Sequence, residues 1–148
     1  MPTPATYDDA NLCLRLYELR RDDTLRQARA WFVQNFGPTT LEELTRIAPP
    51  GSQENTYMRM VTSYWDMAAA FVTSGVLNQE LFFQTNPECL LVWERFRHVV
   101  PALREAFKSP AAYRNLETVG NAFMKHMEAS GPQALSAFQA RINAMVKR

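Results

Sequence analysis

The sequence predicts an all-α fold: a single-domain bundle of seven to eight helices. Apolar residues recur at three- and four-residue spacing along most of the chain. Capping residues precede these segments, and glycine or proline follows several of them. Strand-like patterns are nearly absent. A chain of 148 residues, 47% hydrophobic, can bury a core without disulfides or metal, so we expect one domain over residues 1–148, with 1–7 disordered or extended.

The first two segments predict an N-terminal antiparallel helical hairpin. The first helix spans roughly 8–20, with an apolar stripe formed by Leu12, Leu16 and Leu19. The second helix stops at Gly37-Pro38 and has a face formed by Leu25, Ala28, Phe32 and Phe36. Because the link at Arg21-Asp22 is short, we expect the two helices to pack antiparallel.

The middle of the chain predicts three further helices. Thr40 and Glu43 form a capping box for a short helix that ends before Pro49. Ser52 can cap the longest helix, which runs to near Gly75 and is apolar over most of its circumference, so it should be central. Asn78 can cap one short helix after it.

The next helix should begin at Asn86-Pro87, a cap residue followed by proline at the first helical position. Its apolar stripe keeps one phase past Pro101. We therefore expect one helix kinked at Pro101 rather than two helices. The stripe consists of Val92, Trp93, Phe96, Val99, Val100, Leu103 and Phe107.

Two helices complete the predicted bundle. One starts at Ser109-Pro110 and places Gly120 in its apolar seam, which indicates close approach of a neighbouring backbone. The last follows Gly131-Pro132. Its apolar residues are Leu135, Phe138, Ile142 and Met145.

Composition excludes several classes of protein. The formal charge of +1 provides no field for general nucleic-acid binding. The longest apolar run, residues 67–72, is far shorter than a membrane span, and the N-terminus does not resemble a signal peptide. The isolated cysteines, Cys13 and Cys89, fit thiols in a reducing compartment. We therefore expect a soluble, cytoplasmic protein.

No catalytic, metal or cofactor site is predicted. The two histidines, His98 and His126, lack the Glu-x-x-His pattern of a di-iron bundle. Glu94 lies four residues before His98, a spacing more typical of a solvated ion pair than of zinc ligands. Nucleophile-elbow and dinucleotide motifs are missing, and five glycines leave little scope for a phosphate loop.

Asp66 is the most ambiguous polar residue, because it lies between Trp65 and Met67 on the most apolar helix. Either it faces water or forms a structural salt bridge, or it lines a ligand cleft. We expect it to accept a hydrogen bond from another helix, with Arg97 as the donor, because the planar fork of arginine suits a carboxylate. The candidate ligand or structural cluster is Asp66, Arg97, Tyr64, Trp65, Glu94 and His98.

Residues 57–97 resemble an uncharacterised family of bacterial all-helical domains. The resemblance is carried by Tyr64-Trp65-Asp66-Met67-Ala68, the stop at Gly75, the segment 76–82, and Trp93-Glu94 with Arg97. The opening segment 16–20 is similar too, so the match covers about residues 8–107. The resemblance implies an all-α domain and no established activity.

Two functional hypotheses follow. The first is a non-enzymatic helical interaction domain that acts by self-association or by binding a protein partner. The second is a small-ligand binder or enzyme with a polar site near Asp66, Arg97 and Tyr64. A deep pocket lined by apolar and charged residues would favour the second hypothesis, and a flat apolar patch would favour the first.

Overall fold

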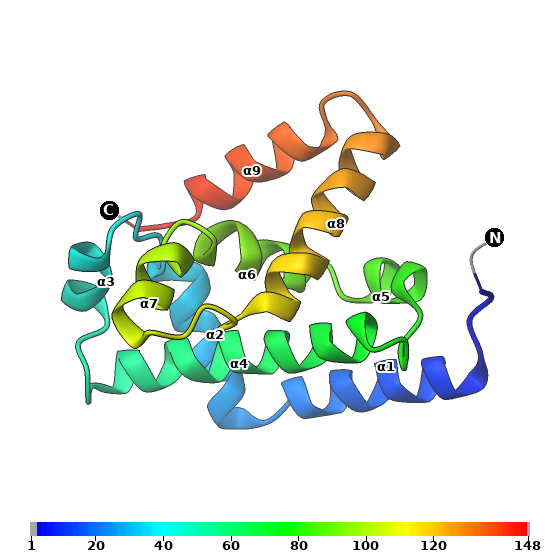
Figure 1. Ribbon diagram of the computed structural model, residues 1–148, viewed down its shortest axis with the longest axis horizontal. Coiled ribbons are helices and arrows are strands. Elements are labelled where there is room, and N and C mark those ends of the chain that lie inside the picture. The colour runs from blue at the N-terminus through cyan, green and yellow to red at the C-terminus, as the bar shows by residue number, and fades with distance from the viewer. Residues whose placement is uncertain (1–2, 148) are drawn as a thin grey trace.

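The computed structural model describes residues 3–147, which form nine α-helices and no strand (Figure 1). The all-α prediction is confirmed, with one helix more than the predicted upper number. The helices are α1 (Tyr7–Arg20), α2 (Asp23–Asn35), α3 (Leu41–Ile47), α4 (Gln53–Thr73), α5 (Gln79–Thr85), α6 (Glu88–Phe96), α7 (Val100–Phe107), α8 (Arg114–Ser130) and α9 (Ala134–Ala144).

Side-chain caps fix several helix starts where the sequence predicts them. The Asn55 N–H donates to Ser52 Oγ at 3.1 Å, and the Leu81 N–H donates to Asn78 Oδ1 at 2.8 Å. Thr40 accepts from the Glu43 N–H, while the Glu43 carboxylate accepts from Thr39 rather than from Thr40. Half of the predicted capping box is therefore formed.

The long helix α4 is the centre of the fold, as predicted (Figure 1). It packs against α2 and α8 and also contacts α6. Its Trp65 is fully buried and meets Tyr64 and Phe82 edge-on. One continuous apolar cluster extends from this helix into most of the others.

The first two helices do not pack along each other as the predicted hairpin. The link is short, but α2 turns away from α1 and lies against α4, while α1 lies against α5 (Figure 1). The apolar face of α2 is buried as predicted: Leu25, Ala28, Phe32 and Phe36. A short link limits the separation of two helix ends but not the angle between the helices, and burial of that face against α4 sets the angle here.

The predicted kinked helix is two helices, and this correction accounts for the ninth helix. α6 ends at Phe96, and α7 begins at Val100 with Pro101 in its first turn. Pro101 has no N–H to donate to the Arg97 carbonyl, and the Val99 N–H reaches back to Phe96 at 3.1 Å in a tighter turn. The stripe is buried except for Phe107, which is 64% exposed.

The last two helices differ from prediction at their ends. Residues 110–113 form turns, so α8 begins at Arg114 rather than at Ser109-Pro110; Tyr113 before it has a φ of 59°. Phe138 and Ile142 of α9 are buried, but Met145 is 46% exposed.

The N-terminal segment is described from residue 3. Thr6 and Asp9 form a capping box for α1, and Thr3 accepts a hydrogen bond from the Asn78 side chain at 2.8 Å. Residues 1 and 2 of the predicted disordered or extended stretch lie outside the described residues. Within residues 3–147, no helix has the length and apolar content that crossing a membrane requires.

Candidate functional site

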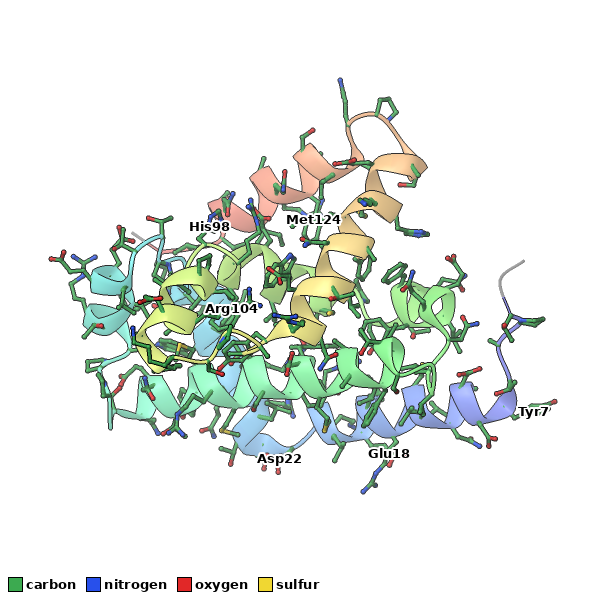
Figure 2. All side chains as sticks on the ribbon, viewed as in Figure 1. Tyr7, Glu18, Asp22, His98, Arg104 and Met124 are labelled. Carbon is green, nitrogen blue, oxygen red and sulfur yellow. The ribbon has the colours of Figure 1, made fainter. Side chains whose placement is uncertain are left out.

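An apolar groove runs between α1 and α5 and encloses about 390 Å³. We call it the α1 groove. Its lining residues are Ala10, Cys13, Leu14, Tyr17, Arg20, Leu81 and Thr85. Figure 2 places α1 along the lower edge of the molecule, between the labelled Tyr7 and Asp22.

Helix α1 has apolar residues on two faces, and this is why it leaves a groove. Leu16 on the inner face is 1% exposed. On the outer face, Tyr7, Leu14 and Tyr17 are 91%, 60% and 54% exposed. A helix needs one apolar stripe to pack on a core. The second stripe therefore remains available for contact with another molecule.

At the C-terminal end of α1 the groove meets a basic hollow of about 430 Å³. We call it the arginine corner. It is lined by Tyr17, Arg20, Arg21, Arg26 and Arg29. The arginines come from the end of α1, the turn after it and the first turns of α2. Tyr17 and Arg20 line both hollows, so the two are adjacent.

Arg20 is held in place by neutral partners. Its Nη1 donates to Asn86 Oδ1 at 2.8 Å and to the Tyr64 hydroxyl at 3.3 Å. Its guanidinium lies over the Trp65 ring, 5.2 Å from the centroid. Asn86 therefore holds Arg20 and makes no side-chain cap for α6, which corrects the predicted role of Asn86.

Tyr64 stays a neutral hydroxyl. Burial raises its pKa above the ordinary value of 10.0, and the nearby Arg20 opposes the shift. Its hydroxyl donates to the Leu16 carbonyl at 2.6 Å while it accepts from Arg20. The Arg20 charge therefore has no carboxylate partner among these contacts.

The other three arginines differ in their pairing. Arg29 Nε donates to both Glu88 carboxylate oxygens at 2.8 Å, so its charge is neutralised. Arg21 and Arg26 are exposed, and within residues 3–147 neither side chain forms a hydrogen bond or ion pair. Three guanidinium groups, those of Arg20, Arg21 and Arg26, therefore lack a neutralising partner at the corner.

The six residues predicted as one polar cluster lie in separate places. Tyr64 and Trp65 contact Arg20, as described above. Asp66 Oδ1 accepts from the Leu116 N–H at 3.0 Å, in the first turn of α8. The prediction that Asp66 accepts from another helix is confirmed, but Arg97 as the donor is wrong. A backbone N–H that lacks a partner within its helix supplies the bond instead.

Glu94 and Arg97 form their own pair. Glu94 is 2% exposed and accepts two bonds from Arg97, at 2.9 and 3.1 Å, and one from Gln139 at 3.3 Å. The expected pairing of Glu94 with His98 does not form, because α6 ends at Phe96 and His98 lies in the turn. Partial burial and the Arg97 cation lower the pKa of His98 below 6.5. Figure 2 shows His98 well separated from Asp22, the cap residue of α2.

Arg95 is a polar centre that sequence reasoning missed. It is 2% exposed and donates only to backbone carbonyls: Phe32, Val33 and Phe36 at the end of α2, and Ile142 of α9. Burial lowers its pKa, and Glu94 opposes the shift. The sequence carries one signal for this environment: Leu90 lies outside the apolar stripe of its helix, which indicates protein on more than one side of the helix. Leu90 is indeed buried, because α6 is surrounded by protein.

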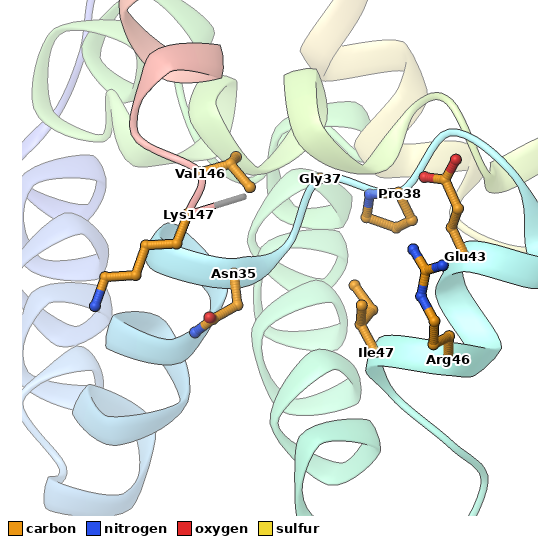
Figure 3. Close-up of a pocket in the computed structure, with 8 residues that line it drawn as sticks. All are labelled: Asn35, Gly37, Pro38, Glu43, Arg46, Ile47, Val146 and Lys147. Carbon is orange, nitrogen blue, oxygen red and sulfur yellow. The ribbon is translucent and has the colours of Figure 1, made fainter.

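A further hollow of about 330 Å³ lies between the ends of α2 and α3 and residues 146–147 (Figure 3). Figure 3 shows Lys147 on the opposite side of the hollow from Glu43 and Arg46, so the charges do not converge. Glu43 already accepts from the Thr39 N–H. Across residues 3–147, no group of three or more His, Cys, Asp or Glu side chains is arranged to hold a metal ion.

The family model of DUF4760, a domain of unknown function, matches residues 5–123. The chain belongs to this family. The DUF4760 match extends beyond the predicted resemblance at both ends and contains the α1 groove and the arginine corner. It stops at Phe123 inside α8 and leaves α9 outside. No curated protein and no solved structure matches the chain.

Proposed function

We propose that this chain, as a single domain, is a non-enzymatic binding module for another protein. The α1 groove holds the apolar face of a partner helix, and the arginine corner binds acidic groups at one end of that helix. The observation that carries the proposal is that an apolar groove lies next to unpaired arginines and shares two lining residues, Tyr17 and Arg20, with the arginine corner. Helix-in-groove binding uses this combination of apolar anchors and flanking charge.

The lining residues support binding rather than catalysis. General acid–base chemistry needs a titratable group within reach of the reacting atoms. The groove and the corner are lined by no Asp, Glu or His among the described residues. Cys13 lines the groove, and its sulfur accepts from the Thr85 hydroxyl at 3.5 Å rather than contacting a base.

Charge favours an acidic partner over a second copy of this chain. The corner exposes unpaired arginines, and complementary charge directs association. The chain as a whole has a net charge of only +1, so the corner is a local feature. A partner with carboxylates or other anions beside its apolar face fits both parts of the surface.

The test is selection of short random peptides, displayed on phage, against the immobilised full chain. We expect the enriched peptides to combine apolar residues at helical spacing with acidic residues at one end. Their binding should be lost in Leu14→Glu and weakened in Arg21→Gln/Arg26→Gln. The matched control is Phe107→Glu, since Phe107 is 64% exposed and Leu14 is 60% exposed.

Two outcomes would overturn the proposal. One is that enriched peptides bind Leu14→Glu as well as wild type. The other is that the wild-type chain sediments as a dimer that Leu14→Glu converts to a monomer, since the occupant of the groove would then be a second copy.

We also propose that the protein works in a reducing, cytoplasmic setting. Cys13 and Cys89 are both free thiols. Localisation of a fluorescently tagged chain in its native cell tests this, and secretion would contradict it.

A further inference from the structure

We propose that the arginine corner recognises a phosphate monoester carried by the docked partner. The inference rests on the proposed function and specifies the anion that the corner selects. Arg29 is neutralised by Glu88, whereas Arg20, Arg21 and Arg26 have no carboxylate partner.

The charge at the corner favours a dianion. One carboxylate from a partner would neutralise one of the three unpaired guanidinium groups. A phosphate monoester carries a charge of about −1.5 to −2 near neutral pH and offers three strong acceptor oxygens. Planar arginine forks match such oxygens bidentately. Of single side-chain groups on a protein partner, a phosphorylated one therefore fits the corner best.

The corner is also partly preorganised. Asn86 and Tyr64 hold Arg20, and the bidentate Glu88 pair holds Arg29. These contacts fix two walls of the hollow before an anion enters. The two remaining arginines are exposed and can close on the ligand. Fixing part of a site in advance lowers the cost of ordering it on binding.

The carboxylates of Asp22 and Asp23, which are close in sequence to the arginine corner, do not occupy it, so an anion can enter. Asp22 accepts from the Leu25 N–H at 3.1 Å and so is engaged as the cap of α2. Asp23 lies in the first turn of α2, where it interacts favourably with the helix dipole. Neither residue lines the hollow.

The experiment titrates the full chain with phenyl phosphate and phenyl sulfate near neutral pH, observed by amide chemical shifts. Phenyl sulfate has a similar shape but a single charge. We expect saturable shifts around residues 17–29 and binding of phenyl phosphate roughly tenfold tighter than of phenyl sulfate, the effect of one charge-assisted hydrogen bond. Binding should weaken with added salt.

Arg21→Gln/Arg26→Gln should weaken phenyl phosphate binding by roughly tenfold or more. Both side chains are exposed, so the thermal midpoint should not change. The control is Arg59→Gln, another exposed arginine, on α4. Equal affinity for phosphate and sulfate, or unchanged binding by the double variant, would overturn the inference.

Peptide binding, measured with and without phosphorylation, distinguishes the phosphate site from the proposed docking function. A selected peptide should bind more tightly after serine phosphorylation at its acidic end. If phosphorylation and phenyl phosphate both have no effect while peptide binding still needs Leu14, the phosphate site is wrong and the docking function stands. If phenyl phosphate binds but no peptide does, docking is wrong and the source is a free phosphate compound.

Discussion

Position 120 requires glycine, because the indole of Trp93 occupies the space that a Cβ atom would need. A Cβ built on Gly120 would lie 2.3 Å from Trp93 Cδ1 and Cγ. The Trp93 Nε1–H donates to Asn121 Oδ1 at 3.0 Å, so the ring cannot move without losing that bond. The predicted close contact is confirmed, with a side chain rather than a backbone as the neighbour.

We predict that Gly120→Ala destabilises the domain, although alanine favours helix by ~1 kcal/mol. The methyl group would displace Trp93 in a packed core, at a typical cost of ~1–3 kcal/mol. Chemical denaturation measures the free energy of unfolding. Gly131→Ala is the control, because a Cβ there meets only Ala134, at 3.9 Å. An equally or more stable Gly120→Ala would contradict the contact.

Asp9 joins the start of α1 to the start of α5. Its carboxylate accepts from the Thr6 N–H and the Asn78 N–H, both at 2.8 Å. These two backbone donors lower the pKa of Asp9 below 3.8. A lowered folded-state pKa means that the ionised group stabilises the fold above the unfolded pKa, and that this contribution is lost as pH falls through the folded pKa.

We therefore predict that Asp9→Asn lowers stability near neutral pH. The difference from wild type should begin to shrink below about pH 4 and disappear only after pH has fallen through the lowered folded-state pKa. Denaturation midpoints measured across pH test this. Asp8→Asn, at an exposed neighbour, should leave the pH profile unchanged. A constant difference at all pH values would show that the Asp9 charge does not matter.

Among the elements, α6 connects distant parts of the chain through Arg95. Arg95 Nη1 donates to the Phe36 carbonyl at 2.8 Å, and Nη2 donates to the Ile142 carbonyl at 2.6 Å. The C-terminal ends of α2 and α9 carry partial negative charge, and their carbonyls have few donors within the helix. One buried cation thus satisfies the ends of two helices.

Arg95→Met should keep the packing volume while removing both bonds and leaving the buried Phe36 carbonyl without its Arg95 donor, which costs ~1–3 kcal/mol. We expect amide hydrogen exchange to increase in α9 more than in α4, because α9 loses its bond to α6. Arg141→Met, an exposed change on α9, is the control. Unchanged exchange in α9 would mean that apolar contacts alone hold that helix.

Local sequence patterns predict where helices form better than they predict which helices pack against each other. Ser52 and Asn78 cap as predicted because capping depends on residues three positions away. The sequence predicts one helix kinked at Pro101 rather than a turn at residues 97–99, because the apolar stripe continues through that turn. The partners of Asp66 and Arg95 are backbone groups of distant helices, and no side-chain pattern in the sequence encodes a backbone donor or acceptor.

At the scale of the whole molecule, the two cysteines differ in their exposure to solvent, so their reactivity reports on different parts of the fold. Cys89 is fully buried, and burial raises the pKa of its thiol, so the reactive thiolate is suppressed. Cys13 is partly exposed and lines the α1 groove. The chain therefore has one accessible thiol and one enclosed thiol.

We predict that iodoacetamide modifies Cys13 in the native protein and reaches Cys89 only after global unfolding. Mass spectrometry of timed samples measures both rates, and added denaturant should accelerate only the second one strongly. Cys13→Ser provides the control that isolates the Cys89 signal. Rapid native modification of Cys89 would show that the core around α6 opens locally.

The position of Cys13 allows a fluorescent probe of groove occupancy to be attached to the wild-type chain. A small environment-sensitive fluorophore attached to this thiol would lie in the α1 groove, with Cys89 shielded from labelling. Entry of an apolar helix would exclude water from the dye and change its emission, whereas an anion confined to the arginine corner would leave the dye in water. One labelled protein could then follow occupancy of the groove in real time, without any engineered residue.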